Sequence, residues 1–228
     1  MTGEKISALW EEVSRSPEDK GKIKKYCDAV LLLTHNPDEW KREKEEALGH
    51  LEMLCDRGER SAMSALGIIL KQHGEMQDPG RALELLKKAA EEGDEDALRI
   101  CGETMRDGIP GLVEKDLTAA REYFEKLDAA GNVLGSVLLA KLYREGSETI
   151  PRDYMKAFEL LKKAADREDT CMGWAALDVG SAYLEGTEDV PSDPEKAKHY
   201  FGIAKKCGIF ADVQIKAAEA AVKSAKKA

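Results

Sequence analysis

Histidine and cysteine are the side chains of this sequence best suited to bind a metal ion or to act as a nucleophile. They stand at His35, His50, His73 and His199 and at Cys27, Cys55, Cys101, Cys171 and Cys207. Zinc sites draw such residues from closely spaced pairs, and no pair of that kind occurs here. The motifs HExxH, GxxxxGK[ST], GxGxxG and GxSxG are also absent from the sequence. The sequence therefore predicts no catalytic residue, no metal site and no cofactor.

The same residues have structural interpretations. His50 and His199 fall within predicted helices, where a solvated or half-buried histidine is the commoner case. The cysteines are expected to be small buried apolar residues rather than nucleophiles. Their odd number and the lack of a CxxC pair are typical of reduced thiols in a cytosol.

The composition and net charge of the chain disfavour some classes of binding partner. The chain has 228 residues, of which 43% are hydrophobic, 35% charged and only 6% aromatic, which favours a helical protein. Its net charge of −9 repels nucleic acids and anionic membranes. The N-terminal residues lack the apolar core of a signal peptide, and the longest apolar run, residues 29–33, is too short to span a membrane. We therefore expect a cytoplasmic protein with no nucleic-acid or membrane partner.

A repeat organises the sequence. The pattern Asp-x-x-x-Ala begins at Asp78, Asp116, Asp153 and Asp193, with 37 to 40 residues between starts. Apolar residues follow each alanine at four and seven positions, the spacing of one buried helix face. Each aspartate is predicted to cap the helix N-terminus, and a glycine to end the helix. These glycines are Gly93, Gly131 and Gly208, with Glu168 as the departure.

A second helix precedes each of these helices, so that every repeat is a helical hairpin. A small residue recurs within this helix at Gly67, Gly102, Ala140 and Gly180. A glycine inside a helix lowers stability, so its recurrence predicts that a neighbouring helix comes close at this position.

Both ends of the chain extend this pattern. A weaker copy runs from Glu43 to Gly58, with Glu43 in the place of the aspartate, and two more helices are predicted over residues 4–14 and up to Leu33. At the other end, residues 211–228 are predicted to form one helix that covers the last repeat. Its apolar face is mostly alanine, which disfavours the alternative of a membrane-bound amphipathic helix.

The repeats resemble the Sel1-like repeat, a relative of the tetratricopeptide repeat. The segment ALDVGSAYLEGTEDVPSDPEKAKHYFGIAKKCG, residues 176–208, carries the resemblance most completely, and it extends over about residues 62–208. His73 replaces the expected turn glycine and Ala140 the expected small glycine. The resemblance implies an all-α protein, a right-handed α-solenoid of about five antiparallel helix hairpins with terminal capping helices. One domain, 1–228, would comprise the units 18–58, 59–93, 94–131, 132–168 and 169–208 and a capping helix over 209–228.

What the resemblance implies about function is a non-enzymatic adaptor that assembles other proteins. Some secreted members carry a disulfide in each repeat, but the cysteines here recur at no fixed repeat position. By similarity with tetratricopeptide repeats, partners bind along the concave face of the first helices. The candidate groove residues are Lys71, Arg106, Lys141, Arg144, Val137, Trp174, Leu177 and Leu184.

The basic groove residues and Trp174 each allow two interpretations. Lys71, Arg106 and Arg144 occupy one register, and such a basic stripe would bind an acidic or carboxylate-bearing peptide. The alternative is a solvated helix position whose cations are offset by Asp107 and Glu145. Trp174 is either a binding anchor or a residue that packs against the next unit.

We therefore predict a monomeric, non-enzymatic scaffold that binds a protein or peptide on its concave face. The alternative is a self-associating structural or regulatory subunit of a larger complex. A member that binds small molecules or catalyses a reaction is the least favoured interpretation.

Overall fold

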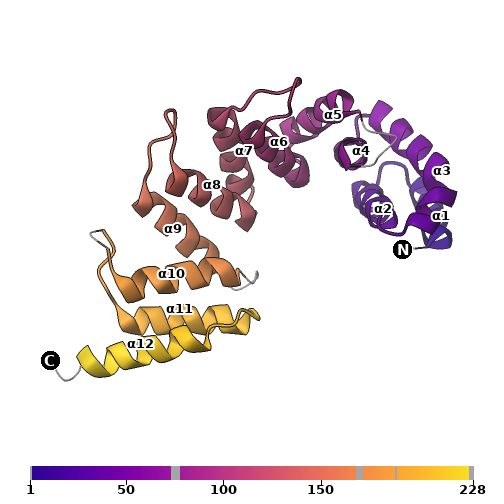
Figure 1. Cartoon of the computed structure of the whole chain (residues 1–228). Coiled ribbons are helices and arrows are strands. Elements are labelled where there is room, and N and C mark those ends of the chain that lie inside the picture. The colour runs from indigo at the N-terminus through magenta and orange to yellow at the C-terminus, as the bar shows by residue number, and fades with distance from the viewer. Residues whose placement is uncertain (1, 73–77, 168–171, 188, 226–228) are drawn as a thin grey trace. The chain divides into compact units, whose positions relative to one another are not determined.

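The computed structural model describes residues 2–72, 78–167, 172–187 and 189–225 (Figure 1). Within these ranges the chain forms helices and no β-strand, which confirms the all-α prediction. The predictions for His73, Glu168 and Cys171 concern residues outside the described ranges. The helices are α1 Gly3–Arg15, α2 Lys20–Leu33, α3 Pro37–Asp56, α4 Arg60–Gln72, α5 Pro79–Glu91, α6 Glu95–Asp107, α7 Leu117–Ala129, α8 Val133–Glu145, α9 Tyr154–Ala165, α10 Gly173–Glu185, α11 Pro194–Lys206 and α12 Asp212–Ala225.

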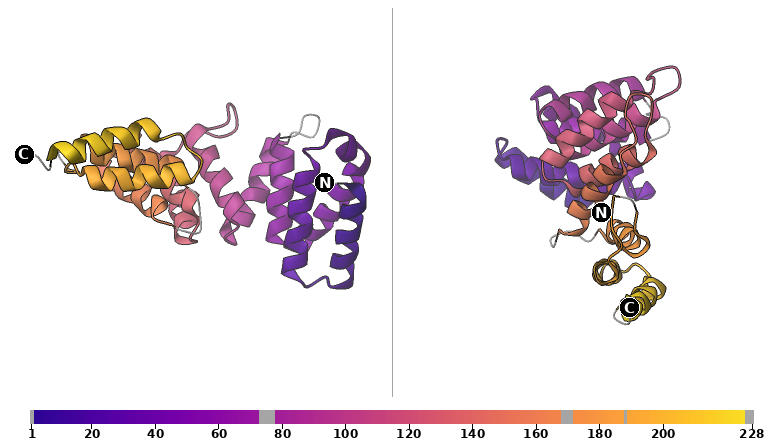
Figure 2. Two further views of the ribbon diagram at one scale, coloured as in Figure 1. Left: turned by 90° about the horizontal axis from the view of Figure 1, so that it is seen from below. Right: turned by 90° about the vertical axis from the view of Figure 1, so that its left-hand side faces the viewer.

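The chain divides into two compact units, Met1–Lys115 with α1 to α6 and Asp116–Ala228 with α7 to α12. Consecutive helices pack against each other within each unit, and the hairpins of both units can be followed in two further views (Figure 2). We refer to them as the N-terminal unit and the C-terminal unit.

The predicted helix starts are confirmed. The carboxylates of Asp78, Asp116, Asp153 and Asp193 each accept a hydrogen bond from the backbone N–H three residues further on, at 2.8–3.0 Å. This bond satisfies one of the N–H groups that a helix leaves unpaired at its N-terminus. The predicted helix ends are confirmed at Gly93, Gly131 and Gly208, whose positive φ angles suit glycine.

Two of the four recurring small residues, Gly67 and Gly180, mark a close helix contact, as predicted. A Cβ atom added to Gly67 of α4 would lie 2.7 Å from the Leu86 Cγ atom of α5, and one added to Gly180 of α10 would lie 2.6 Å from the Phe201 ring of α11. In these two repeats, the first helix therefore packs with its glycine directly on the large apolar residue of the second helix.

The N-terminal unit differs from the prediction in one helix. We expected the weak repeat to begin at Glu43, but α3 already begins at Pro37, and Asn36 caps it by accepting a hydrogen bond from the Glu39 N–H. Proline is tolerated in the first helical turn, so Asn36-Pro37 is the stronger start signal. The two helices predicted before it are present as α1 and α2.

The C-terminal unit ends in three helices that lie side by side, α10, α11 and α12 (Figure 1). Phe201 lies at the centre of their core and is fully buried. Ala218 is the one residue of α12 in the buried class, so most of this helix is open to water on its outer face, as expected for a terminal helix.

Two loops of the C-terminal unit have the same hydrogen bonds. In one, Ser147 N–H donates to the Ile150 carbonyl and the Ser147 hydroxyl accepts from the Ile150 N–H; Thr187 and Val190 repeat both bonds in the other. Ile150 and Val190, the apolar residues of these two loops, are both buried. The loop after α10 thereby fixes Val190 beside α9 and α10.

Candidate binding surfaces

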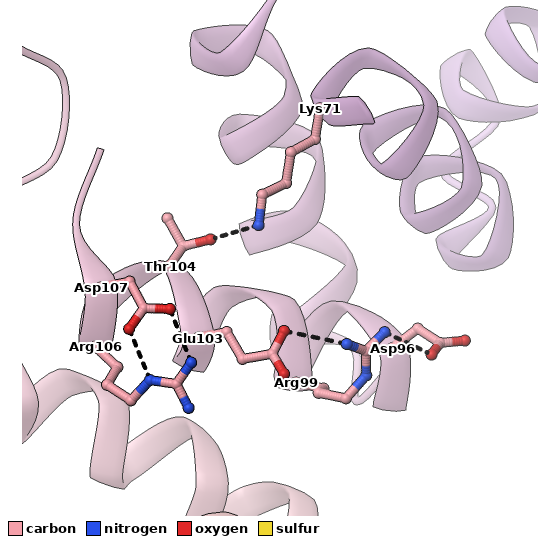
Figure 3. Close-up of polar contacts among 7 residues, drawn as sticks. All are labelled: Lys71, Asp96, Arg99, Glu103, Thr104, Arg106 and Asp107. Carbon is pink, nitrogen blue, oxygen red and sulfur yellow. Dashed lines mark hydrogen bonds and ion pairs between the residues drawn. The ribbon is translucent and has the colours of Figure 1, made fainter. Parts of the chain in front are cut away.

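Lys71 and Arg106, the predicted groove cations of the N-terminal unit, both contact neighbouring groups (Figure 3). The Lys71 Nζ atom donates to the Thr104 hydroxyl at 3.2 Å and so joins α4 to α6. The Arg106 guanidinium forms two hydrogen bonds of 2.8 Å with the carboxylate of Asp107. Asp107 therefore offsets Arg106, as the solvated-position interpretation expects.

Arg99 adds a third cation to this surface (Figure 3). It contacts Glu103 at 3.1 Å and Asp96 at 3.5 Å. Three carboxylates of α6 thus accompany the three cations, so this surface carries little net charge with which to attract an acidic peptide.

The predicted cations of the C-terminal unit also form ion pairs. Lys141 lies 4.0 Å from Glu145 in the same helix. Arg144 of α8 lies 3.0 Å from Asp178 of α10 and so joins the first helices of two successive repeats. Both pairs are largely exposed, where an ion pair contributes little to stability.

The predicted apolar residues separate into two groups. Val137, Leu177 and Leu184 are half-buried and pack against the core of the C-terminal unit. Trp174 instead exposes 70% of its surface. Of the predicted apolar residues, Trp174 is thus the one available as an anchor.

Exposed apolar residues that the sequence did not indicate lie on the segment after α11, which contacts the residue before Trp174. Gly173, the residue before it, lies against Ile209: a Cβ atom at this glycine would be 2.6 Å from the Ile209 side chain. Phe210 follows Ile209 and is 75% exposed, and Val213 in the first turn of α12 is 66% exposed. Figure 1 shows the start of α10 and the connection from α11 to α12 at the same end of the unit. We call Trp174, Phe210 and Val213 the aromatic patch.

A cleft with a volume of about 580 Å³ lies elsewhere on the same unit. It is bounded by the end of α8, by α9 and α10, and by the loop after α10. We call it the α9–α10 cleft. Arg144 is the one predicted groove residue that lines it. Ser181 and Glu185 occupy groove positions of the first helix α10, whereas most of the others come from a second helix and a loop, which the groove positions do not include.

The described free cysteines are poor nucleophiles. Burial raises the pKa of the Cys101 thiol to about 11 and that of Cys55 to about 12, and it also raises the pKa of Cys27. A thiol with such a pKa stays protonated at neutral pH, and the thiolate is the reactive form.

The expectation that all cysteines are reduced is wrong for Cys207, which is disulfide-bonded. This residue ends α11 and lies beside Gly173, because α10 and α11 pack together. The spacing of cysteines in the sequence does not reveal a pairing that depends on such tertiary packing.

The described residues offer neither a metal-binding cluster nor a membrane-spanning helix. No group of three or more His, Cys, Asp or Glu side chains in them has the geometry to hold a metal ion. Among their helices, none combines the length and apolar character needed to cross a membrane.

The comparison with protein families identifies the repeats. The Sel1 repeat matches at residues 60–94, 96–131, 135–169 and 175–209. This chain belongs to the Sel1 repeat family. Sel1 repeat proteins generally mediate protein–protein interactions, and their repeats form non-catalytic scaffolds. The family model does not match residues before 60, where α1 to α3 lie.

Solved structures of Sel1 repeat proteins have the same fold. A Sel1 repeat protein from Oxalobacter formigenes aligns with a TM-score of 0.67 and 17% identity over 96% of this chain and 99% of its own. The protective antigen c5321 of uropathogenic Escherichia coli, which displays an SLR fold, aligns with a TM-score of 0.57 and 18% identity over 92% of this chain and 55% of its own. These likenesses support the α-solenoid prediction.

Proposed function

We propose that this Sel1 repeat protein is a non-enzymatic scaffold and that a partner protein docks on the aromatic patch. The observation that carries the proposal is the exposure of Trp174 and Phe210, two large aromatic side chains at one end of the C-terminal unit. Aromatic residues dominate binding energies at protein interfaces, and monomeric proteins rarely leave several of them exposed together.

The charges around the aromatic patch favour an acidic partner. Residues 205–216, on either side of Phe210 and Val213, contain three lysines and one acidic residue, although the whole chain has a net charge of −9. This acidic residue, Asp212, is already paired with Lys205. Lys206 and Lys216 form no ion pair within the described residues. We therefore propose that the docking segment combines an apolar side chain with carboxylates.

Apart from Trp174, this proposal places the partner on different residues from the predicted concave groove. The groove cations Lys71, Arg106, Lys141 and Arg144 already contact groups of the chain itself, so a partner would have to displace those groups.

We keep the predicted monomeric state, with self-association through the aromatic patch as the alternative. The disulfide at Cys207 favours an oxidising compartment over the predicted cytoplasm.

The experiment is affinity capture from the native cells, followed by a binding measurement with the purified partner. Replacing Trp174 and Phe210 by alanine is expected to weaken binding at least tenfold, because interface aromatics each contribute about 2 kcal/mol or more. Lys206→Glu with Lys216→Glu is expected to weaken it as well. Leu32→Ala with Met53→Ala serves as the control, since both residues are exposed apolar residues of the N-terminal unit.

Two results would contradict the proposal. Unchanged binding by the Trp174 and Phe210 double variant would remove the aromatic patch from the interface. A dimer in sedimentation experiments that dissociates in this variant would favour self-association instead.

A further inference from the structure

The α9–α10 cleft has an apolar interior. Phe158 and Leu161 of α9 face Val179 and Ala182 of α10, and Val190 closes one side from the loop. Phe158, Val179 and Val190 are buried members of the core of the C-terminal unit, so the interior is held in place by packing. Its volume of about 580 Å³ lies within the range of ligand sites in proteins and exceeds that of a single apolar side chain.

The edge of the cleft is acidic. Asp178 is paired with Arg144 at 3.0 Å, but Glu185 and Asp189 form no ion pair with any cation in the described part of the chain. Both carboxylates are exposed. A ligand whose apolar part enters the cleft therefore meets two uncompensated negative charges at the opening.

A second pocket adjoins the cleft, and its lining includes Lys196, which is paired with Asp193 at 3.2 Å. It has a volume of about 250 Å³ and shares Met155, Phe158, Asp189 and Val190 with the cleft, so the two adjoin along α9. Glu159 lines this pocket and is a third carboxylate without an ion pair in the described residues. An extended chain could thus place one side chain in the cleft and continue over the smaller pocket.

We propose that the α9–α10 cleft binds an extended peptide segment of a partner protein that inserts an apolar side chain and carries lysine or arginine beside it. The apolar side chain removes the exposed surface of Tyr154 and Met155 from water, and the cation pairs with Glu185 and Asp189. Nucleic acids and anionic lipids are disfavoured as occupants, because their phosphates are repelled by these carboxylates.

This inference goes beyond the proposed function. The aromatic patch has a basic surrounding and favours an acidic partner, whereas the cleft has an acidic edge and favours a basic one. The two sites share no residue. The chain would therefore hold two partners of opposite charge, and either site can fail its test without the other.

The test uses the full chain and a phage-displayed library of random heptapeptides. Selection on the wild-type protein is expected to enrich peptides that pair Leu, Ile, Met or Phe with Lys or Arg. Ser181→Trp fills the cleft, and we expect it to abolish binding of a synthetic enriched peptide. Glu185→Lys with Asp189→Lys leaves the interior unchanged, and we expect it to weaken binding at least tenfold. High salt is expected to weaken binding of the wild type.

Glu122→Lys with Glu148→Lys is the matched control, because it makes the same change of charge at exposed positions of the same unit that do not line the cleft. It is expected to bind the peptide like the wild type. The proposal would be overturned if the library enriched acidic peptides or no peptide at all. It would also be overturned if an enriched peptide bound both cleft variants normally, or if the control lost peptide binding as much as they do. A dimer that Ser181→Trp dissociates would also overturn it, since the occupant would then be a second copy of the chain.

Discussion

His50 joins three helices of the N-terminal unit. Its ring stacks on Trp10 of α1, with the ring centroids 3.6 Å apart, and its Nδ1 atom forms a hydrogen bond of 2.8 Å with the Tyr26 hydroxyl of α2. Burial lowers the pKa of His50, and the nearby carboxylate of Glu46 partly opposes this change. The histidine was expected to be solvated or half-buried, and it is half-buried. The stack and the hydrogen bond were not expected, because they bring together residues from three helices.

The lowered pKa of His50 predicts how stability depends on pH. Because the folded pKa lies below the unfolded value of about 6.5, the unfolded chain binds more protons in this range. The free energy of unfolding is therefore expected to fall as the pH drops below about 6.5. Denaturant titrations at several pH values measure it.

Two variants isolate the contribution of His50. His50→Gln is expected to reduce the loss of stability between pH 7 and pH 5, although it removes the ring stack and so costs about 0.5–1.5 kcal/mol at neutral pH. His199→Gln changes an exposed histidine of the C-terminal unit and should keep the wild-type dependence. If His50→Gln also keeps it, protonation of His50 does not cause the change.

At the scale of the helices, Gly180 and Gly202 provide an internal comparison. They lie in the neighbouring helices α10 and α11. A Cβ atom at Gly180 would overlap the buried ring of Phe201 at 2.6 Å, whereas one at Gly202 would have nothing within 4 Å. The same substitution therefore tests packing at one site and backbone freedom at the other.

Gly180→Ala is expected to lower the free energy of unfolding by about 1–3 kcal/mol, because the Phe201 ring must move in a packed core. Gly202→Ala is expected to raise it by about 0.5–1 kcal/mol, because alanine loses less backbone entropy in a helix. Urea denaturation measures both values. If Gly180→Ala stabilises the chain as Gly202→Ala does, the close contact does not constrain the repeat.

Local signals explain which helices could be predicted from the sequence. An aspartate cap and its N–H donor are three residues apart, so the pattern at Asp193 is contained in one short segment. The start of α3 was missed because Glu43 was aligned with the repeat, while the stronger Asn36-Pro37 signal lies outside the repeat pattern. The start of a helix is thus determined by its local capping residues, even where the repeat pattern suggests another position.

The candidate sites depend on residues that are distant in the sequence. Trp174 could be named from its repeat position, but Phe210 joins it only through the contact between Gly173 and Ile209. The α9–α10 cleft likewise combines Arg144, Phe158 and Val190 from three repeat elements. The repeat pattern specifies which face of each helix is buried, and it does not specify how loops and helix ends meet.

At the scale of the whole molecule, each unit has its own hydrophobic core. One core is built from residues of α1 to α5 and the other from residues of α8 to α12. In repeat proteins, stability is approximately a sum of terms for each repeat and for its contacts with the adjacent repeats. A substitution in one core is therefore expected to change local stability mainly within its own unit.

Hydrogen exchange measured by mass spectrometry tests this expectation. Gly180→Ala is expected to speed amide exchange in α10 and α11, whose contact it disturbs, and to leave exchange in α2 to α4 at the wild-type rate. Gly202→Ala, which meets no neighbouring atom, should speed exchange in neither unit. Equal acceleration of α2 to α4 by Gly180→Ala would mean that both units open in one cooperative step, and the two cores could then not be treated as separate sources of stability.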